Sequence, residues 1–231
     1  MAKKTNSVNA LLNDPDAIRI CLALRNSAQV LKGLTGVFMD EPATPERTAS
    51  FIGACNIVES MERIGQGDEV ADDDFFHWTH EEVAADVEKI LGGDKPKISL
   101  LASSWIPVFD WKGGVSPAER IEAALEEFGI RGKPGLPLDH LAVTANLFSY
   151  MCACLLNDAE EDRSLTRGEF IAEFMNLWHF LNNFLLWSRQ LEAPINELPD
   201  GPVKTGLNKL IAYIDVFNDA QGSLIAGMGL R

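Results

Sequence analysis

The most constraining feature of this sequence is the apolar pattern between Leu141 and Leu156. Its side chains recur at alternating spacings of four and three residues, which is the spacing of one face of an α-helix: Leu141, Ala145, Phe148, Cys152 and Leu155. A second apolar set widens that face: Leu147, Met151 and Cys154. A helix with so wide an apolar face must be covered by other elements. The pattern therefore predicts a central helix packed among further helices.

Four other helix starts are marked by a residue that can cap the first turn. Each is followed by a first-turn proline or by an acid three residues on, as in a capping box. The pairs are Asp14 with Pro15, Thr44 with Pro45, Thr79 with Glu82, and Ser116 with Glu119. These signals predict helices that begin near residues 15, 45, 80 and 117.

The apolar faces of these helices follow from spacing in the same way. The first helix is outlined by Ile18, Leu22, Arg25, Gln29 and Leu31, and the second by Phe51, Ile52, Cys55, Val58 and Met61. One long helix is predicted over 165–192 and a last one over 203–220. Residues 98–101 fit either a short strand or a buried turn. About seven helices with at most one strand predict an all-α helical bundle.

The segment 129–137, GIRGKPGLP, contains three glycines and two prolines and cannot continue a helix. We therefore expect a hinge here between two closely packed lobes. Residues 1–13 are predicted to be a polar tail, and residues 14–231 a single all-helical domain.

The formal net charge of −14 argues against broad binding to nucleic acid, which requires a basic surface. It favours a basic partner, or serves solubility alone. No secretory signal follows Lys3 and Lys4, and the most apolar window, 147–156, is about half a membrane span, so a cytoplasmic protein without membrane insertion is expected. The four cysteines, Cys21, Cys55, Cys152 and Cys154, are too sparse for a disulfide framework. Cys152 and Cys154 lie within a helix pattern and are interpreted as buried thiols in preference to a metal site.

The dipeptide Asp139-His140 stands between the predicted hinge and the central helix. Asp139 can cap that helix by accepting hydrogen bonds from its first-turn amides, with His140 partly exposed beside it. The alternative is that the pair forms a functional edge on the hinge. Spacing alone favours the cap.

Two other groups of residues could form a site. The loop aromatics Trp105, Phe109 and Trp111 could anchor a peptide or equally close over the core. His77 and His80, beside the acidic run 72–74, could bind a metal in a helical metal- or cofactor-dependent enzyme, although a solvated loop is the simpler interpretation.

The pentapeptide Leu136-Pro137-Leu138-Asp139-His140, at the head of a long apolar helix, resembles the E-P-x-D-H motif of the TorD/DmsD/NarJ-type chaperones. Other features are similar in the same order: LRNSAQVLKGLTGVFMDEP, an aromatic loop before SPAERIEAALEEFGI, and NNFLLW at 182–187. The similarity covers roughly residues 15–220. The chain departs from the family at positions occupied here by Leu136, Thr144, Asn146 and Asn183, the first three acidic and the last histidine in the family pattern.

These chaperones are cytoplasmic, all-helical proteins dedicated to molybdoenzymes of the dimethyl sulfoxide reductase type. The resemblance implies a chaperone that binds the catalytic subunit of a molybdenum-containing oxidoreductase, or its twin-arginine signal peptide, and assists folding and cofactor insertion. It implies no catalysis, no cofactor of the chain's own, and a monomer or a helix-swapped homodimer. The expected client groove lies near the hinge and uses Pro137, Asp139 and His140, with Trp105, Phe109 and Trp111.

Overall fold

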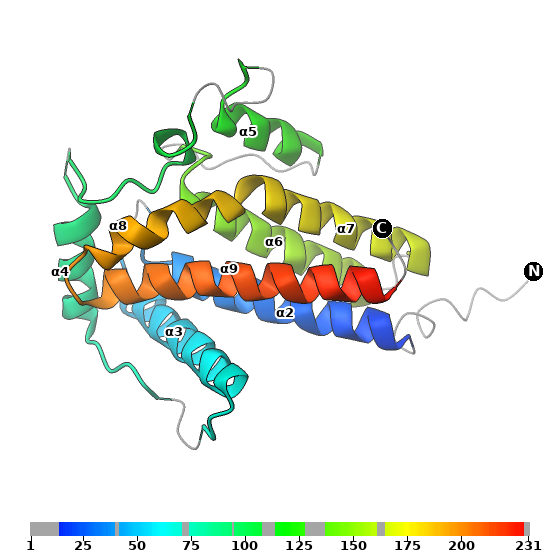
Figure 1. Cartoon of the computed structure of the whole chain (residues 1–231), viewed down its shortest axis with the longest axis horizontal. Coiled ribbons are helices and arrows are strands. Elements are labelled where there is room, and N and C mark those ends of the chain that lie inside the picture. Colours follow the sequence, from blue (N-terminus) through cyan, green and yellow to red (C-terminus); the bar gives the residue numbers. More distant parts are fainter. Residues whose placement is uncertain are drawn as a thin grey trace, which may run out of the picture.

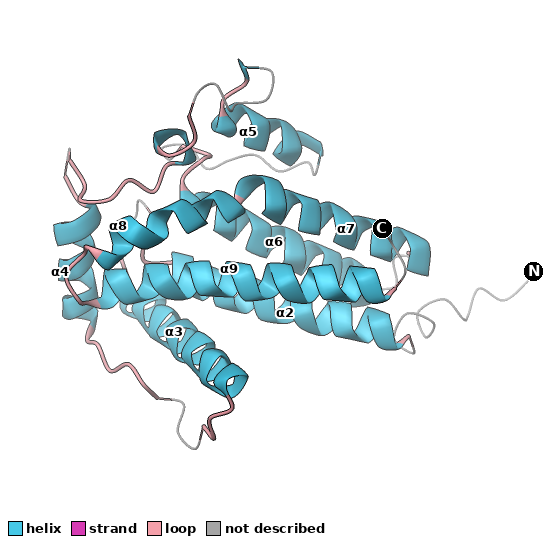
Figure 2. Ribbon diagram, in the orientation of Figure 1, coloured by secondary structure: helices cyan, strands magenta, loops and turns pink. Residues whose placement is uncertain are grey.

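The computed structural model of the chain describes residues 14–39, 42–70, 74–93, 95–107, 114–127, 137–160 and 165–228. In these ranges the chain is helical, with loops between the helices and no strand (Figure 2). The helices are α2 (Pro15–Thr35), α3 (Pro45–Gln66), α4 (His80–Leu91), α5 (Pro117–Glu127), α6 (Leu141–Glu160), α7 (Arg167–Phe184), α8 (Glu192–Asn196) and α9 (Pro202–Gly227). Two 3-10 segments accompany them, η1 (Ala102–Ser104) and η4 (Leu186–Leu191). The predicted all-α bundle is confirmed.

Four long helices, α2, α6, α7 and α9, run side by side and form the body of the molecule (Figure 1). Helix α3 packs on α2 and α9 and leaves the body at an angle, α4 lies at one end against α9, and α5 lies outside α7. One hydrophobic core contains buried side chains from all of these helices. At its centre the Phe148 ring of α6 lies 6.2 Å from Phe180 and 5.7 Å from Phe217.

The predicted hinge falls between α5 and α6, and residues 128–136 lie outside the described residues. The helices on its two sides nevertheless share the core, because α2 packs along α6. Ser149 of α6 donates a hydrogen bond to the Ala28 carbonyl of α2 at 2.7 Å.

The predicted helix starts are confirmed at all four places. Asp14 accepts from the amide of Asp16 at 2.9 Å, and Thr44 accepts from the amide of Arg47. The capping boxes form at Thr79 with Glu82 and at Ser116 with Glu119. Hydrogen bonds from the Ser116 amide and hydroxyl hold the pKa of Glu119 below its usual value.

The face predicted for the first helix is wrong except at Leu31, which is buried. Ile18 and Leu22 are 41% and 53% exposed, and α2 instead turns other apolar side chains toward the core: Ala17, Ile20, Leu24 and Leu34. The same kind of error affects α3, where Met61 is 39% exposed. Both helices have more apolar side chains than their buried face accommodates.

The single helix predicted over 165–192 is also wrong. Helix α7 ends at Phe184, and the chain winds more tightly as η4, in which the Ser188 amide donates to the Leu185 carbonyl at 3.0 Å. This tighter winding buries Leu185, Trp187 and Leu191 together. The last helix continues beyond its predicted end at residue 220, to Gly227.

Contacts between distant helices fix α9 in place. Lys209 of α9 is held by Glu59 and Glu62 of α3, with its Nζ atom 2.6 Å from the Glu59 carboxylate. The hydrogen bond from Lys209 holds the pKa of Glu59 below its usual value. At the start of α9, Asp86 of α4 accepts a hydrogen bond from the amide of Val203 at 3.0 Å.

Residues 98–101 form neither a strand nor a helix turn. Leu101 makes one antiparallel bridge with His140, and η1 follows directly. None of the described helices combines the length and the apolar character needed to cross a membrane.

Candidate peptide-binding groove

A groove of about 710 Å³ lies where α4 and the end of α2 meet the residues before α6. Most of its lining is apolar and comes from five separate segments of the chain. The lining residues include Phe38, Met39, Ala84, Val87, Leu91, Ile98, Leu101, Pro137 and His140. The described part of this lining has one carboxylate, on the exposed Glu88. A cavity of this size and character suits apolar side chains of a bound segment.

Pro137 and His140 both line this groove, so the structure brings two of the predicted site residues together. They belong to a turn in which the His140 amide donates to the Pro137 carbonyl at 3.1 Å. Pro137 is exposed and His140 is half-buried.

Asp139 lies behind the groove, not in it. Only 2% of the residue is exposed, and its Oδ2 atom accepts a hydrogen bond from the amide of Ser103 at 2.9 Å. Its own carbonyl accepts from the amide of Ala102 at 2.9 Å. The bond that the structure gives to its carboxylate goes to the η1 segment and not to the first turn of α6, so Asp139 is a tertiary anchor and not the predicted helix cap.

The first turn of α6 is closed by other groups. The amide of Leu141 donates to the Leu100 carbonyl at 2.7 Å, and the Thr144 hydroxyl donates to the Leu138 carbonyl at 2.8 Å. Thr144 is fully buried. An ionised acid at this position would lack the proton that Thr144 donates and would be buried without a cation.

Trp105 has a structural partner. Its indole N–H donates to the Ser99 carbonyl at 2.8 Å, and the half-buried ring packs against the core. Trp105 therefore holds a loop whose residues 98–101 line the groove, and it does not itself line the groove. Phe109, Trp111 and Leu136 lie outside the described residues.

Among the described residues, His77 and His80 are not brought together as a metal site, and Asp72 and Asp73 of the acidic run lie outside the described residues. His77 is exposed and lies 3.4 Å from Asp74, whereas the Nδ1 atom of His80 lies 2.9 Å from the Thr48 hydroxyl and its ring lines the groove. In the described part of the chain, no three histidine, cysteine or acidic side chains are grouped as metal ligands would be. His80 instead belongs with the groove residues.

Two of the four cysteines, Cys55 and Cys152, are buried. Burial raises the pKa of Cys55 to about 12 and also raises the pKa of Cys152, so neither thiol ionises near neutral pH. Cys21 is half-buried and Cys154 is exposed, which corrects the prediction that Cys152 and Cys154 are both buried.

The contribution of α4 to the groove was not anticipated from the sequence. The sequence of α4 carries an apolar stripe formed by Val83, Val87, Ile90 and Leu91. Val83 and Ile90 are buried, but Val87 and Leu91 are half-buried and face the groove with Ala84. The sequence signal for this was an apolar stripe wider than the face that α4 buries in the core.

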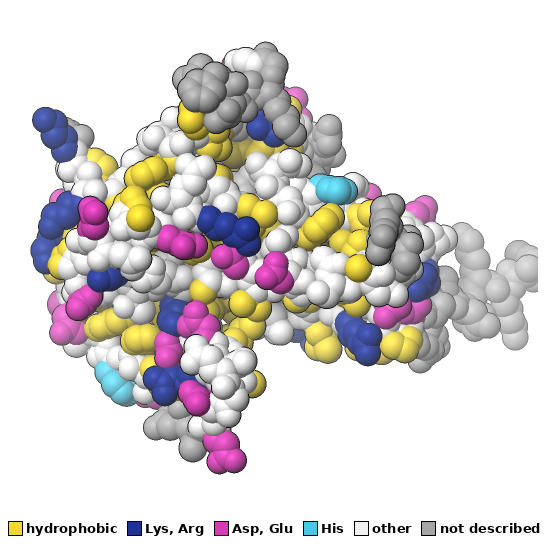
Figure 3. Space-filling model, in the orientation of Figure 1, with side chains coloured by type: hydrophobic (Ala, Val, Ile, Leu, Met, Phe, Trp, Pro, Cys, Tyr) yellow, Lys and Arg dark blue, Asp and Glu magenta, His cyan; other side chains and the backbone are white. Residues whose placement is uncertain are grey.

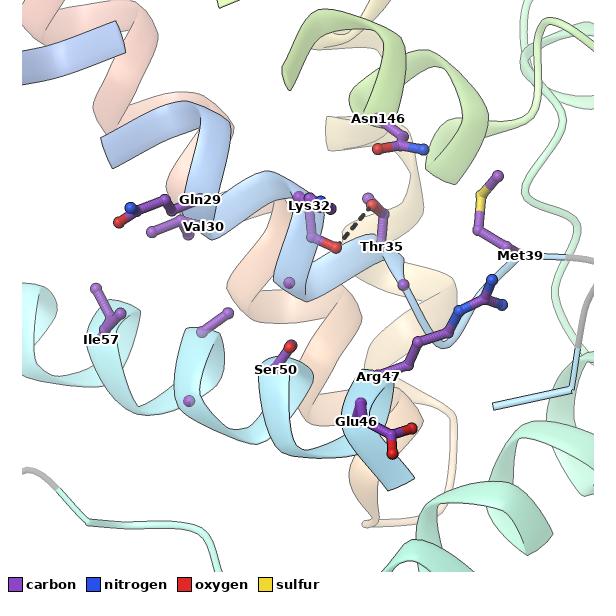
Figure 4. Close-up of a pocket in the computed structure, with 14 residues that line it drawn as sticks. Gln29, Val30, Lys32, Thr35, Met39, Glu46, Arg47, Ser50, Ile57 and Asn146 are labelled. Carbon is purple, nitrogen blue, oxygen red and sulfur yellow. Dashed lines mark hydrogen bonds between the residues drawn. The ribbon is translucent and has the colours of Figure 1, made fainter. Parts of the chain in front are cut away.

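A second cavity of about 650 Å³ lies between α2 and α3 (Figure 4). Met39 lines both cavities, so the loop after α2 separates them. Comparison of the chain with protein-family models, with curated proteins and with solved structures finds no match. Function is therefore inferred from the geometry of the groove and from the sequence motifs.

Proposed function

We propose that this protein is a cytoplasmic chaperone that binds the apo form of a molybdenum-containing oxidoreductase, through a segment such as its N-terminal signal peptide, and assists cofactor insertion. The groove lined by Pro137, His140 and α4 is the client site, and it performs no covalent chemistry. The observation that carries this proposal is a mainly apolar groove of about 710 Å³ beside the Pro-x-Asp-His turn.

The character of the groove lining supports a binding role. Its lining offers aliphatic and aromatic surface from Phe38, Val87 and Leu101, with His80 and His140 as the polar groups near the turn. Burial of a client's apolar side chains there contributes about 25 cal/mol per Å² of apolar area removed from water. The two imidazoles can hydrogen-bond the backbone of an extended or helical segment.

The test uses the tagged protein purified from its native cell, with mass spectrometry of what accompanies it. The expected result is the catalytic subunit of a molybdoenzyme with little bound molybdenum. Ala84→Arg places a long charged side chain in the groove from a half-buried position on α4, and we expect it to abolish this recovery. Val216→Ser, at an exposed site on α9 away from the groove, is the matched control.

Recovery of no molybdoenzyme, or equal recovery with Ala84→Arg, would contradict the proposal. His140→Ala is the milder groove variant and should weaken recovery without loss of fold. Asp139 is unsuitable as a site variant, because its substitution removes the anchor to Ser103.

A further inference from the structure

The cavity between α2 and α3 lies next to the groove proposed as the client site, which we call the client groove. At the end of α2 the two linings are consecutive in the chain: the cavity includes Thr35 and Gly36, and the client groove includes Val37 and Phe38. Met39 lines both. The two spaces, of about 650 and 710 Å³, therefore meet at one side chain.

The first turn of α3 makes a second connection between the two spaces. Arg47 lines the cavity, and the hydroxyl of the next residue, Thr48, lies 2.9 Å from Nδ1 of His80, which lines the client groove. Figure 4 shows the Arg47 side chain extended toward Met39 at one end of the cavity, with Ile57 at the other end. The cavity thus runs from Ile57 toward the client groove.

The floor of the cavity is made of small residues. A methyl group at Gly33 would lie 2.7 Å from the Cβ atom of Ala54 and 2.8 Å from the Ser50 carbonyl oxygen, so α2 and α3 approach each other closely there. Gly53, which also lines the cavity, has open space around it. Because the residues at this crossing are small, the cavity beside it has room for side chains of another molecule.

Hydrogen-bonding side chains line the cavity from three helices. Gln29 of α2, Ser50 of α3 and Asn146 of α6 contribute to the lining, and none of these three side chains forms a hydrogen bond with another described residue. Carboxamides and hydroxyls both donate and accept hydrogen bonds. An extended polypeptide presents free N–H and C=O groups that such side chains can bond, whereas a helix bonds these groups internally. The lining therefore favours an extended segment.

The cavity and the client groove differ in polarity and not in the sign of their charge. Lys32, Glu46 and Arg47 line the cavity, so it contains charges of both signs. The described lining of the client groove has the single carboxylate of Glu88 among mainly apolar side chains. Acidic and basic side chains are also interspersed over the face of the molecule shown in Figure 3. A segment that fits both spaces is therefore apolar at one end and polar at the other, whatever its net charge.

We propose that the client groove and the cavity between α2 and α3 form one continuous binding site, which holds a single extended segment of the client across Met39. Apolar client residues lie in the client groove against Val87 and Leu101. The polar client residues next to them lie between α2 and α3, where Gln29 and Asn146 bond the client backbone. Methionine suits the junction, because its unbranched side chain adapts to different neighbours. This inference rests on the function proposed above, since its occupant is the same client.

The dimensions of the cavity limit how far apart the two parts of the client segment can be. On α2 the cavity lining extends from Gln29 to Thr35, a rise of about 9 Å at about 1.5 Å per residue. An extended segment covers that distance with about three residues at about 3.3 Å each. Client residues that contact the cavity and those that contact the client groove should therefore lie within about ten residues of each other.

The test is photo-crosslinking of the full-length protein in its native cell. The photoreactive residue p-benzoylphenylalanine replaces Ile57 in the cavity, Leu91 in the client groove or the exposed Val216 on α9, one at a time. We expect the Ile57 and Leu91 variants to crosslink to one stretch of one polypeptide, at positions within about ten residues of each other. The Val216 variant should give no crosslink to that stretch.

Two glycine variants test the cavity by a different route. Gly53 and Gly65 both belong to α3, are exposed and have open space where a side chain would begin, but of the two only Gly53 lines the cavity. Gly53→Arg places a long side chain in the cavity and should lower recovery of the client at least about ten-fold relative to Gly65→Arg, a ratio that corresponds to about 1.4 kcal/mol. Circular dichroism and thermal unfolding establish that both variants are equally folded.

The outcomes separate this inference from the proposed function. Crosslinks of both variants to neighbouring positions in a protein that is not a molybdoenzyme would support the continuous site and contradict the proposed function. Crosslinks from the Leu91 variant alone, crosslinks of the two variants to distant segments or different proteins, or equal recovery with Gly53→Arg and Gly65→Arg would overturn the continuous site without contradicting the proposed function. Crosslinks to a second copy of this chain, or none from the Leu91 variant above the Val216 background, would overturn both.

Discussion

A single carboxylate determines how the residues before α6 are attached to the bundle. Asp139 lies 36 residues from Ser103, yet its Oδ2 atom accepts the Ser103 amide proton inside the protein. Because η1 also bonds the Asp139 carbonyl, the loop and the turn hold each other. The groove walls at Leu101 and His140 depend on this connection.

Removal of the carboxylate is expected to destabilise the fold. Asp139→Ala leaves the Ser103 amide without its charged acceptor, which we expect to lower the free energy of unfolding by about 1.5–3 kcal/mol. Asp139→Asn keeps one acceptor oxygen of similar shape and should cost less. Urea unfolding of the three proteins measures both differences; equal stability of the alanine variant and the unchanged protein would show that the hydrogen bond does not anchor the loop.

At the scale of the elements, α9 packs closely against two aromatic rings at Gly206. A Cβ atom there would lie 2.4 Å from the Phe51 ring of α3 and 3.1 Å from the Phe38 ring. The two rings form an edge-to-face pair with centroids 5.7 Å apart. The position of α9 against α3 therefore depends on residue 206 being glycine, which has no side chain.

Gly206→Ala should destabilise the protein although alanine favours helices. We expect overpacking to lower the free energy of unfolding by about 1–3 kcal/mol. Gly53→Ala, on α3 with open space around it, should raise the free energy by about 0.5–1 kcal/mol through helix propensity alone. Thermal unfolding distinguishes the two signs, and a stabilised Gly206→Ala would show that α9 shifts freely against Phe51.

The helix starts could be predicted from the sequence because their interactions are local. Thr79 and Glu82 bond each other's amides whatever surrounds them. The buried face of α2 could not be predicted, since Ile20 and Leu24 have the same spacing as Ile18 and Leu22. Packing of α2 on α6 determines which of the two faces is buried, and this packing cannot be inferred from the local sequence pattern.

The candidate site could be predicted only in part for the same reason. Pro137 and His140 were identified from a motif and do line a groove, but Asp139 was assigned a local bond and makes a distant one. Ala84 of α4 belongs to none of the motifs identified in the sequence. It becomes a groove residue when α4 packs beside the end of α2, which is a property of the tertiary fold.

For the whole molecule, stability is expected to be unequal between the body and α5. The main contacts of α5 are with α7 and η1, and the side chains it buries include Ile121 and Leu125. Helix α6 lies in the body between α2 and α7. Segments with few buried contacts open at lower free energy than the core.

Hydrogen exchange followed by mass spectrometry should reveal this difference. We expect amides of α5 to exchange at least about ten-fold faster than those of α6 at neutral pH, which corresponds to an opening free energy about 1.4 kcal/mol smaller. Both helices are compared within one protein, so solution conditions are matched. Equal protection of the two helices would show that α5 opens only with the whole bundle.

The bond between Asp86 and Val203 has a consequence for biosynthesis. The ribosome makes α4 long before α9. The Asp86 carboxylate is therefore without the Val203 amide while more than half of the remaining chain is translated. Until α9 emerges, the Phe51 ring of α3, which Gly206 of α9 covers, stays exposed. The final docking of α9 therefore occurs late in translation or after release, and a nascent chain that stalls before residue 202 exposes an adhesive surface to other proteins.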